Sequence, residues 1–177
     1  VFYPIYWGIR SYLASPLLFI QKPWLWLRWI SDLGATQTVA PNFAYQRCAR
    51  LPERNLEGLD LSSLEVAWNG AEPIQAEVLR AFARRFGPCG FRSEAFFPVY
   101  GLAEATLCVT HGGYLEPLRS ERLSRGPWER SGRAALAPPG AEALEVVCVG
   151  RAAAGFEIKV VDEAGQELAE RQRGEIV

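Results

Sequence analysis

The chain has 177 residues, of which 49% are apolar and 22% charged, and its formal net charge is -1. These values are typical of a globular protein and exclude the disordered and fibrous classes. They also provide no general attraction to nucleic acid or anionic lipid, so we expect any binding at a local site.

The two ends of the chain are expected to be cuts through a larger fold. The chain opens without methionine or a secretory signal, and it stops at RGEIV, where an apolar strand has only begun. The most membrane-like stretch, residues 16–30, carries Lys22, Pro23 and Arg28 and is too short and too charged to span a bilayer. Its tryptophans would suit a lipid interface, but a segment apolar nearly all round is more typical of a core helix.

From Ser11 to Gly101, short apolar runs alternate with helical periods. This alternation predicts an α/β fold with parallel strands joined by right-handed crossovers. Proline opens and glycine closes several of the helical segments, as at Pro23 and Gly34. The predicted strands are residues 11–15, 36–40, 64–69 and 94–100, and the predicted helices are residues 23–33, 41–51, 72–87 and 102–109.

After His111 the pattern changes. Residues 113–140 are rich in Arg, Ser, Pro and Gly without a sustained period, and predict a long surface excursion. Three short β-rich runs follow and predict an antiparallel, all-β unit. The runs are residues 145–150, 156–162 and 174–177, and the expected organisation is an α/β subdomain over 1–113, an excursion over 114–143 and an incomplete β subdomain over 144–177.

Four cysteines, Cys48, Cys89, Cys108 and Cys148, are widely spaced. They lack the close pairs that zinc binding or a redox dithiol requires. We therefore expect reduced, buried thiols in a cytoplasmic protein.

The first candidate site is the junction from Trp68 to Gln75, where a strand ends in Asn69-Gly70-Ala71 and a helix is expected to begin near Pro73. In an open α/β sheet, ligands collect where strands end and helices begin. Small residues there allow a flat ligand to lie close to the backbone. An ordinary strand-to-helix turn would explain the same glycine and proline.

The second candidate site is the stretch FFPVYGLAEATL, from Phe96 to Leu107. Tyr100 ends a strand, Gly101 permits a tight turn, and Glu104 is expected in a first helical turn. An aromatic ring can stack on a purine, and a carboxylate beside phosphates can hold Mg²⁺. Alternatively, Glu104 favours a helix dipole and Tyr100 belongs to the core.

Three runs, residues 41–51, 59–74 and 94–107, together resemble the adenylate-forming superfamily, and within it the fatty acyl-AMP ligases. The likeness runs in order through nearly the whole chain. It implies the parallel-sheet βα subdomain of such an enzyme, followed by the start of its small antiparallel β-barrel subdomain.

The resemblance also implies roles for individual residues. One wall of the nucleotide pocket would be Gly70, Ala71, Glu72 and Pro73, with Tyr100 stacked on adenine. Gly101 and Leu102 would bring backbone near the α-phosphate and the acyl carbonyl, with Ala103 and Thr106 beside the phosphate. Glu104 would bind Mg²⁺, and Asn42 and Phe43 would line the acyl tunnel. Glu104 and Thr106 are thus the implied catalytic residues.

The implied reaction is attack of a fatty acid carboxylate on the α-phosphorus of ATP, which yields acyl-adenylate and pyrophosphate. Both reactants are anions, so cations must neutralise them and a scaffold must align them. The implied acceptor is an acyl carrier protein, on a polyketide or peptide synthase. An acyl-CoA ligase of the same fold and a noncatalytic remnant that binds a partner remain alternatives.

The surface excursion after His111 helps to distinguish an acyl-AMP ligase from an acyl-CoA ligase. Residues 115–143 resemble the insertion of the acyl-AMP ligases, which is understood to hinder the domain rotation needed for thioester formation with CoA. A merely tolerated surface loop would have the same length.

The chain also departs from the family pattern. It lacks the glycine-rich phosphate loop, the ribose-binding aspartate and the C-terminal lysine, so the isolated chain is expected to be inactive. Ala152 stands where proline is usual, and Trp7-Gly8 where a Gly-Gly pair is common.

Other function classes fit less well. His111 is the only histidine and no Gly-x-Ser-x-Gly elbow exists, which disfavours a serine hydrolase; His111 is read as a helix-end residue. Arg84 and Arg85 are expected on the solvent face of a helix, where charge usually stays solvated, so no nucleic-acid partner is expected.

Overall fold

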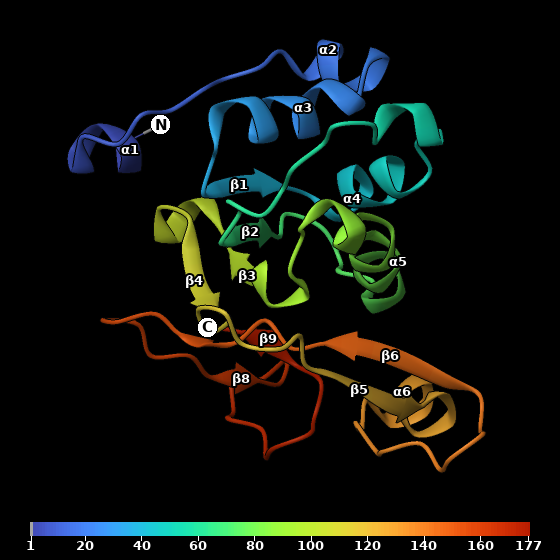
Figure 1. Cartoon of the computed structure of the whole chain (residues 1–177). Coiled ribbons are helices and arrows are strands. Elements are labelled where there is room, and N and C mark those ends of the chain that lie inside the picture. The colour runs from blue at the N-terminus through green and yellow to red at the C-terminus, as the bar shows by residue number, and fades with distance from the viewer. Residues whose placement is uncertain (1) are drawn as a thin grey trace.

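The computed structural model describes residues 2–177, with side chains from Pro4 onward (Figure 1). Within these residues, no helix is long and apolar enough to cross a membrane. The α-helices are α1 (Phe2–Trp7), α2 (Pro16–Gln21), α3 (Trp24–Leu33), α4 (Asn42–Ala49), α5 (Ala76–Phe86) and α6 (Arg125–Ser131). The strands are β1 (Gln37–Ala40), β2 (Val66–Asn69), β3 (Phe96–Gly101), β4 (Cys108–His111), β5 (Ser120–Ser124), β6 (Ala143–Val147), β7 (Arg151–Ala152), β8 (Val160–Val161) and β9 (Glu175–Ile176).

The main sheet has five strands in the order β1-β2-β3-β4-β7. β1, β2 and β3 are parallel, with Val39 opposite Trp68 and Trp68 opposite Phe97. The predicted α/β class, with a parallel sheet, is therefore confirmed. β4 and β7 extend this sheet in antiparallel orientation.

Helices α4 and α5 lie together on one face of the parallel strands (Figure 1). Tyr45 of α4 and Phe82 of α5 are buried there, with ring centroids 5.2 Å apart and an edge-to-face geometry. Phe96 of β3 packs against both rings. Burying each such side chain contributes about 1.5–3 kcal/mol to stability, and each edge-to-face pair adds about 0.5–1.5 kcal/mol.

The hydroxyl of Tyr45 connects this core to the sheet, since it donates a hydrogen bond to the carbonyl oxygen of Trp68 at 3.1 Å. Burial raises the pKa of this hydroxyl, which therefore stays protonated. Cys48 lies in the same core, where burial raises the pKa of its thiol to about 12. The prediction of buried cysteines is correct for Cys48 alone: all four cysteines are free, but Cys89 and Cys108 are half-buried and Cys148 is exposed.

The predicted strand over residues 11–15 is wrong, because this segment has no regular structure and its side chains are exposed. A strand requires a partner for its backbone groups, and none lies beside this segment within residues 2–177. The apolar stretch 16–30 forms parts of two helices, which meet at Lys22 and Pro23. α3 buries Leu27 and Ile30 and ends, as predicted, at Gly34 in a left-handed conformation, whereas α2 has no buried residue.

Two further expectations about helices are corrected. The helix expected to begin near Pro73 begins at Ala76, with Gln75 in an extended conformation before it. The helix predicted over residues 102–109 is absent: a single 3-10 turn, η4 (Ala103–Ala105), is followed by strand β4. His111 consequently ends a strand and not a helix.

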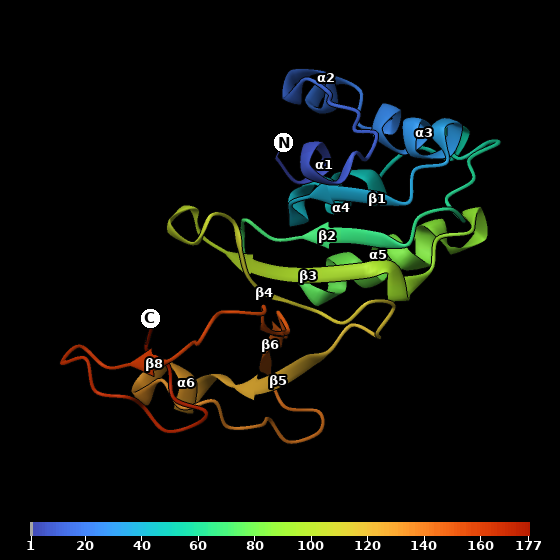
Figure 2. The ribbon, with the colours of Figure 1, turned by 90° about the vertical axis from the view of Figure 1, so that its left-hand side faces the viewer.

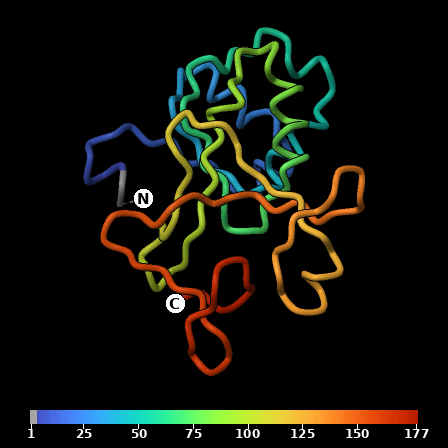
Figure 3. The backbone as a smooth tube through the Cα atoms, turned by 90° about the horizontal axis from the view of Figure 1, so that it is seen from below, coloured from blue at the N-terminus to red at the C-terminus, as the bar shows by residue number. Residues whose placement is uncertain are grey.

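The excursion is more regular than its sequence predicted. β5 and β6 pair antiparallel from Ser120 opposite Val147 to Ser124 opposite Ala143, and α6 follows β5 directly. The run 145–150 thus pairs with the excursion, while β8 and β9 pair with each other as expected for antiparallel strands. Figure 3 views the excursion and the β8–β9 pair from below, as two neighbouring loops.

A charged cluster attaches the excursion to α5. The guanidinium of Arg80 donates to both carboxylate oxygens of Glu145, at 3.0 and 2.6 Å, and the Ser120 hydroxyl donates to the same carboxylate at 2.5 Å. The next residue of β5, Glu121, binds the segment before β9, because Arg171 donates to both of its carboxylate oxygens at 3.0 and 3.1 Å. The excursion therefore connects α5 with the C-terminal β strands.

We expect Glu145→Gln to reduce the stability of the chain at neutral pH by about 0.2–1 kcal/mol, because both partners are partly exposed. The bonds from Arg80 and then Ser120 lower the pKa of Glu145. The contribution of Glu145 is therefore complete above the unfolded-state pKa of about 4.3 and is lost as the pH falls through the lower folded-state pKa. Urea unfolding at several pH values measures the free energy of unfolding of both proteins. The decrease of this free energy at acid pH should be smaller in Glu145→Gln than in the parent. The same pH dependence in both proteins would show that the Glu145 carboxylate does not stabilise the fold.

Candidate nucleotide site

Two loops lie at the same end of the sheet, where the parallel strands finish. One loop follows β2 and runs from Gly70 to Gln75, and the other follows β3 and runs from Leu102 to Leu107. Because β2 and β3 are adjacent and parallel, their carboxyl ends lie side by side. The structure thus brings both candidate sequence motifs to one edge.

The loop after β2 is fastened to the start of α4 by two reciprocal hydrogen bonds. The backbone N–H of Phe43 donates to Glu72 Oε1 at 2.6 Å, and the backbone N–H of Gln75 donates to Asn42 Oδ1 at 3.1 Å. Asn42 is buried, whereas Phe43 is 42% exposed with its ring at the surface. Asn42 and Glu72 therefore fix the course of this loop.

The turn itself is close-packed. A Cβ atom on Gly70 would lie 2.7 Å from Cγ2 of Val99 and 2.9 Å from its carbonyl oxygen, so only glycine fits without movement of β3. Ala71 follows with φ +66°, in the left-handed region that non-glycine residues rarely adopt. These two residues hold the backbone of the loop against the end of β3, with Ala71, Glu72 and Pro73 exposed.

Asn69, the last residue of β2, is fully buried and neither amide atom of its side chain has a hydrogen-bond partner among the described residues. A buried polar group without a partner costs about 1–3 kcal/mol. Such a group in a native structure requires an explanation, such as a functional role or a bound water or ion. No role was predicted for Asn69 from the sequence, where it was noted only as the residue before Gly70.

The loop after β3 is the tip of a hairpin with β4. Tyr100 pairs with Thr110 and Gly101 with Cys108, with a register shift between Tyr100 and Gly101. A Cβ atom on Gly101 would overlap the carbonyl oxygen of Leu107, so the hairpin closes only with glycine there. β4 is anchored in turn, because the Thr110 hydroxyl donates to the carbonyl oxygen of Val149 at 2.7 Å.

Thr106 adopts an unusual conformation within this tip, with φ 68° and ψ -51°. The N–H of Leu107 donates to the carbonyl oxygen of Ala105 at 2.8 Å, which defines a classic γ-turn centred on Thr106. For a β-branched residue this conformation is a clear outlier and stores about 1–3 kcal/mol of strain. Backbone strain of this kind concentrates at ligand sites, and here it lies two residues from Glu104.

Glu104 is exposed at the tip of the hairpin, in the 3-10 turn η4. The described residues contain no cluster of three or more His, Cys, Asp or Glu side chains that could hold a metal by themselves. Mg²⁺ does not need such a cluster, since it is commonly bound by one or two carboxylates together with substrate phosphates. A single exposed glutamate could bind Mg²⁺ in that mode if a substrate phosphate lay beside it.

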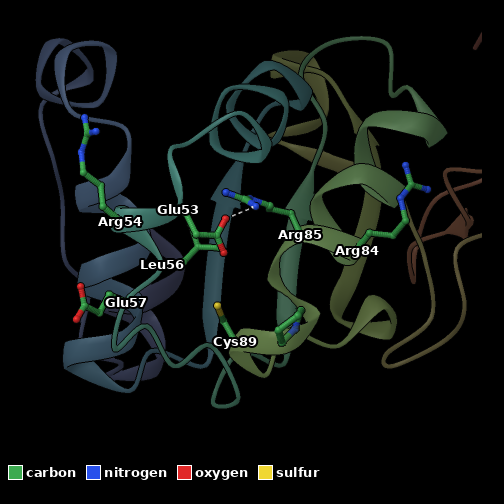
Figure 4. A pocket seen from close by; sticks show the side chains of 8 residues that line it. Glu53, Arg54, Leu56, Glu57, Arg84, Arg85 and Cys89 are labelled. Atoms are coloured by element: carbon green, nitrogen blue, oxygen red, sulfur yellow. Dashed lines mark ion pairs between the residues drawn. The ribbon is translucent and has the colours of Figure 1, made fainter.

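A hollow lies elsewhere, at the other end of the parallel strands (Figure 4). It has a volume of about 550 Å³ and lies where α5 ends, beside η1 (Glu53–Asn55). Arg85 was predicted to project freely into solvent, and this prediction is wrong. Its guanidinium forms an ion pair with Glu53 at 2.6 Å and donates a hydrogen bond to the carbonyl oxygen of Leu51. Since α5 runs antiparallel to the strands, this hollow is far from both loops of the nucleotide site.

Comparison with known proteins shows the family of the chain. The family model described as AMP-binding enzyme matches residues 1–177, so the chain belongs to the AMP-binding enzyme family. The medium-chain-fatty-acid acyl-carrier-protein ligase TtuA of Teredinibacter turnerae is 35% identical over 175 residues, which cover 98% of this chain. The corresponding ligase JamA of Moorena producens is 38% identical over 90% of this chain.

Solved structures show the same fold. The fatty acid AMP ligase from Legionella pneumophila superposes with a TM-score of 0.91 and 39% identity over 98% of this chain, and a structure titled as its complex with acyl adenylate and pyrophosphate superposes equally well. An adenylation domain of a keto acid-selecting peptide synthetase module, at 23% identity, supports the fold alone. The chain spans 27% of the length of both curated ligases and 30% of the Legionella ligase.

Proposed function

We propose that the protein to which these residues belong is a fatty acid-AMP ligase, which activates a fatty acid with ATP as acyl-adenylate and releases pyrophosphate. The observation that carries this proposal is the position of the two loops, at 70–75 and 102–107, after adjacent parallel strands of an AMP-binding fold. The relatives named as fatty acid ligases support the choice of substrate.

In this proposal the loop after β2 forms one wall for the adenine. Gly70 and Ala71 place their backbone at the surface of the loop. The hydrogen bonds that the backbone N–H of Gln75 donates to Asn42, and the N–H of Phe43 to Glu72, prevent the loop from moving away. Tyr100 provides the opposite, aromatic wall at the end of β3. A purine held between a flat backbone and a ring gains stacking and hydrogen bonds to its edge.

The hairpin tip would receive the reacting groups. A carboxylate oxygen of the fatty acid forms a bond to the α-phosphorus as the bond to the pyrophosphate oxygen breaks, and no proton is transferred in this step. The backbone at Gly101 and Leu102 would orient the phosphate and the carboxylate, and Ala103 and Thr106 would flank them. Glu104 would hold Mg²⁺, which when bound neutralises the charge of the phosphates.

The acceptor of the acyl group is proposed to be an acyl carrier protein, as in the names of the two curated ligases. Transfer to CoA is the second candidate, because some relatives are named as fatty-acid–CoA ligases. ATP and Mg²⁺ are the proposed co-reactants, and the cytoplasm is the proposed compartment, since it maintains free thiols such as the exposed Cys148.

The complete product of the gene that encodes this chain tests the proposal. With Mg²⁺, ATP and a series of fatty acids, it should catalyse exchange of labelled pyrophosphate into ATP that depends on the fatty acid, and acyl-adenylate should be detected by mass spectrometry. Adding CoA should leave acyl-adenylate as the main product. Rapid release of acyl-CoA would favour the CoA ligase, and the absence of any exchange would contradict both.

A further inference from the structure

The side chain of Asn69 lies on the helical side of the sheet, at the end of β2. Ala67, two residues earlier on the same strand, belongs to the core beneath α4 and α5, so Asn69 faces the same way. Figure 2 shows β1, β2 and β3 in front of these two helices. Neither Oδ1 nor Nδ2 of the Asn69 carboxamide is accessible to solvent or has a hydrogen-bond partner among the described residues. Because this part of the chain alone encloses the carboxamide, segments elsewhere in the protein cannot reach it without displacing the residues that cover it.

The first turns of α4 and α5 lie at the same end of the sheet as this carboxamide. Asn69 is opposite Ala40 on β1, and α4 begins at Asn42, two residues after Ala40. The Asn42 side chain in turn accepts a hydrogen bond from the N–H of Gln75, the residue before α5. The Asn69 carboxamide is therefore directed at the space where both helices begin.

The start of α5 has polar groups of its own to satisfy. The first four N–H groups of a helix have no partner within the helix, and the side chain of the residue before it commonly accepts a hydrogen bond from one of them. Gln75 occupies that position, but within residues 2–177 no side chain caps α5. Ala76, the first residue of this helix, is buried. The first N–H of α5 and the Asn69 carboxamide thus both require a partner at the same end of the helical layer.

We propose that the Asn69 carboxamide binds internal water between the end of β2 and the start of α5, and that Asn69 is thereby a positioning residue for the adenine wall. Water fits this place because it can donate to Oδ1 and can accept from Nδ2 or from an N–H of α5. Buried water typically makes about three hydrogen bonds to polar groups that otherwise have no partner. A larger ligand such as a nucleotide phosphate cannot reach these enclosed atoms.

Internal water at Asn69 would complete the fixation of the loop over residues 70–75. This loop begins directly after Asn69 and ends where α5 starts, and it is bonded to the start of α4 through Asn42 and Glu72. Without the water, the end of β2 and the start of α5 would lose their polar connection, and the loop between them would be held less firmly. The effect on ATP binding rests on the proposed ligase function, whereas the water site itself does not.

The kinetic test compares Asn69→Val with Asn69→Thr in the complete gene product. The two side chains have the same shape, but only threonine has a hydroxyl that can bind the water. We expect the KM for ATP to rise about tenfold in Asn69→Val, the equivalent of one lost hydrogen bond, and to stay within about threefold of the parent in Asn69→Thr. The KM for the fatty acid should stay within about twofold in both variants, because the adenine wall does not bind the acyl group.

A role in packing alone predicts the reverse order, because a buried hydroxyl without a partner is less favourable than a methyl group. A lower KM for ATP in Asn69→Val than in Asn69→Thr would therefore overturn the inference, as would an equal rise of both KM values. Val66→Ala is the control, since Val66 is buried at the other end of β2; it should lose stability and leave both KM values unchanged. If circular dichroism shows that Asn69→Val does not fold, Asn69→Leu, which fills more of the volume, takes its place.

A crystal structure of the unsubstituted complete protein, at a resolution that shows ordered water, tests the site independently of activity. The expected result is ordered water within hydrogen-bonding distance of the Asn69 carboxamide. A carboxamide that bonds only to protein atoms would overturn the inference. Ordered water at Asn69 in a protein without fatty acid-dependent pyrophosphate exchange would support the water site and contradict the ligase proposal.

Discussion

Replacing Glu104 by glutamine in the complete gene product is expected to lower kcat/KM for acyl-adenylate formation about a hundredfold or more, the order found when one electrostatic group at a reacting centre is removed. Glutamine has nearly the same shape but is a poor ligand for Mg²⁺. The loss should be partly offset by raising the Mg²⁺ concentration, which a purely structural role would not explain. Pyrophosphate exchange over a range of Mg²⁺ concentrations measures both effects.

Glu94 provides the control for this substitution, because it is also an exposed glutamate in a 3-10 turn but lies at the opposite end of β3. Glu94→Gln should leave the Mg²⁺ dependence unchanged. Full activity of Glu104→Gln at limiting Mg²⁺ would remove Glu104 from the proposed metal site. Both variants should unfold at the same temperature as the parent, since neither side chain is buried.

Replacing Gly101 by alanine is expected to destabilise the chain by about 2 kcal/mol or more and to abolish detectable adenylate formation. The added methyl group would overlap the carbonyl oxygen of Leu107, so the hairpin between β3 and β4 would have to open. Opening displaces Tyr100 and Glu104 together, and misplacement of about 1 Å is enough to cost a hundredfold in rate. Thermal unfolding and pyrophosphate exchange measure the two consequences.

Gly87→Ala is the matched control. A Cβ atom at Gly87 would meet nothing within 4 Å, and its φ of -54° lies outside the left-handed region. Because the helical conformation is disfavoured before a proline such as Pro88, this variant should lose less stability than Gly101→Ala and should retain activity. If Gly101→Ala behaved in the same way, the tight closure of the hairpin would not be needed for the site.

The parallel core could be predicted because local signals agree with the tertiary structure there. β1, β2 and β3 are short apolar runs bounded by proline, glycine or asparagine, and α5 has a clear apolar face ending at Gly87. The sequence order of these elements then required parallel pairing through crossovers. Both candidate motifs were located by the same signals, since each follows a predicted strand, although the second was expected to begin a helix.

The segment after Gly101 could not be predicted from local pattern. Residues 102–109 contain good helix formers, yet Gly101 pairs with Cys108, and this non-local pairing makes the segment a hairpin. The bonds that fix the first loop, from Phe43 to Glu72 and from Gln75 to Asn42, join residues about thirty positions apart and have no sequence signature. The contacts of Phe97 with Trp68 and with His111 were missed for the same reason, because the three rings come from three different strands.

A crystal structure of the complete gene product with Mg²⁺ and a nonhydrolysable acyl-adenylate analogue tests the central claim most directly. The account predicts the adenine between the Tyr100 ring and the Gly70–Ala71 backbone, with the Glu104 carboxylate directed at the metal beside the phosphate. Adenine bound away from this edge, or Tyr100 and Glu104 directed away from the ligand, would contradict it.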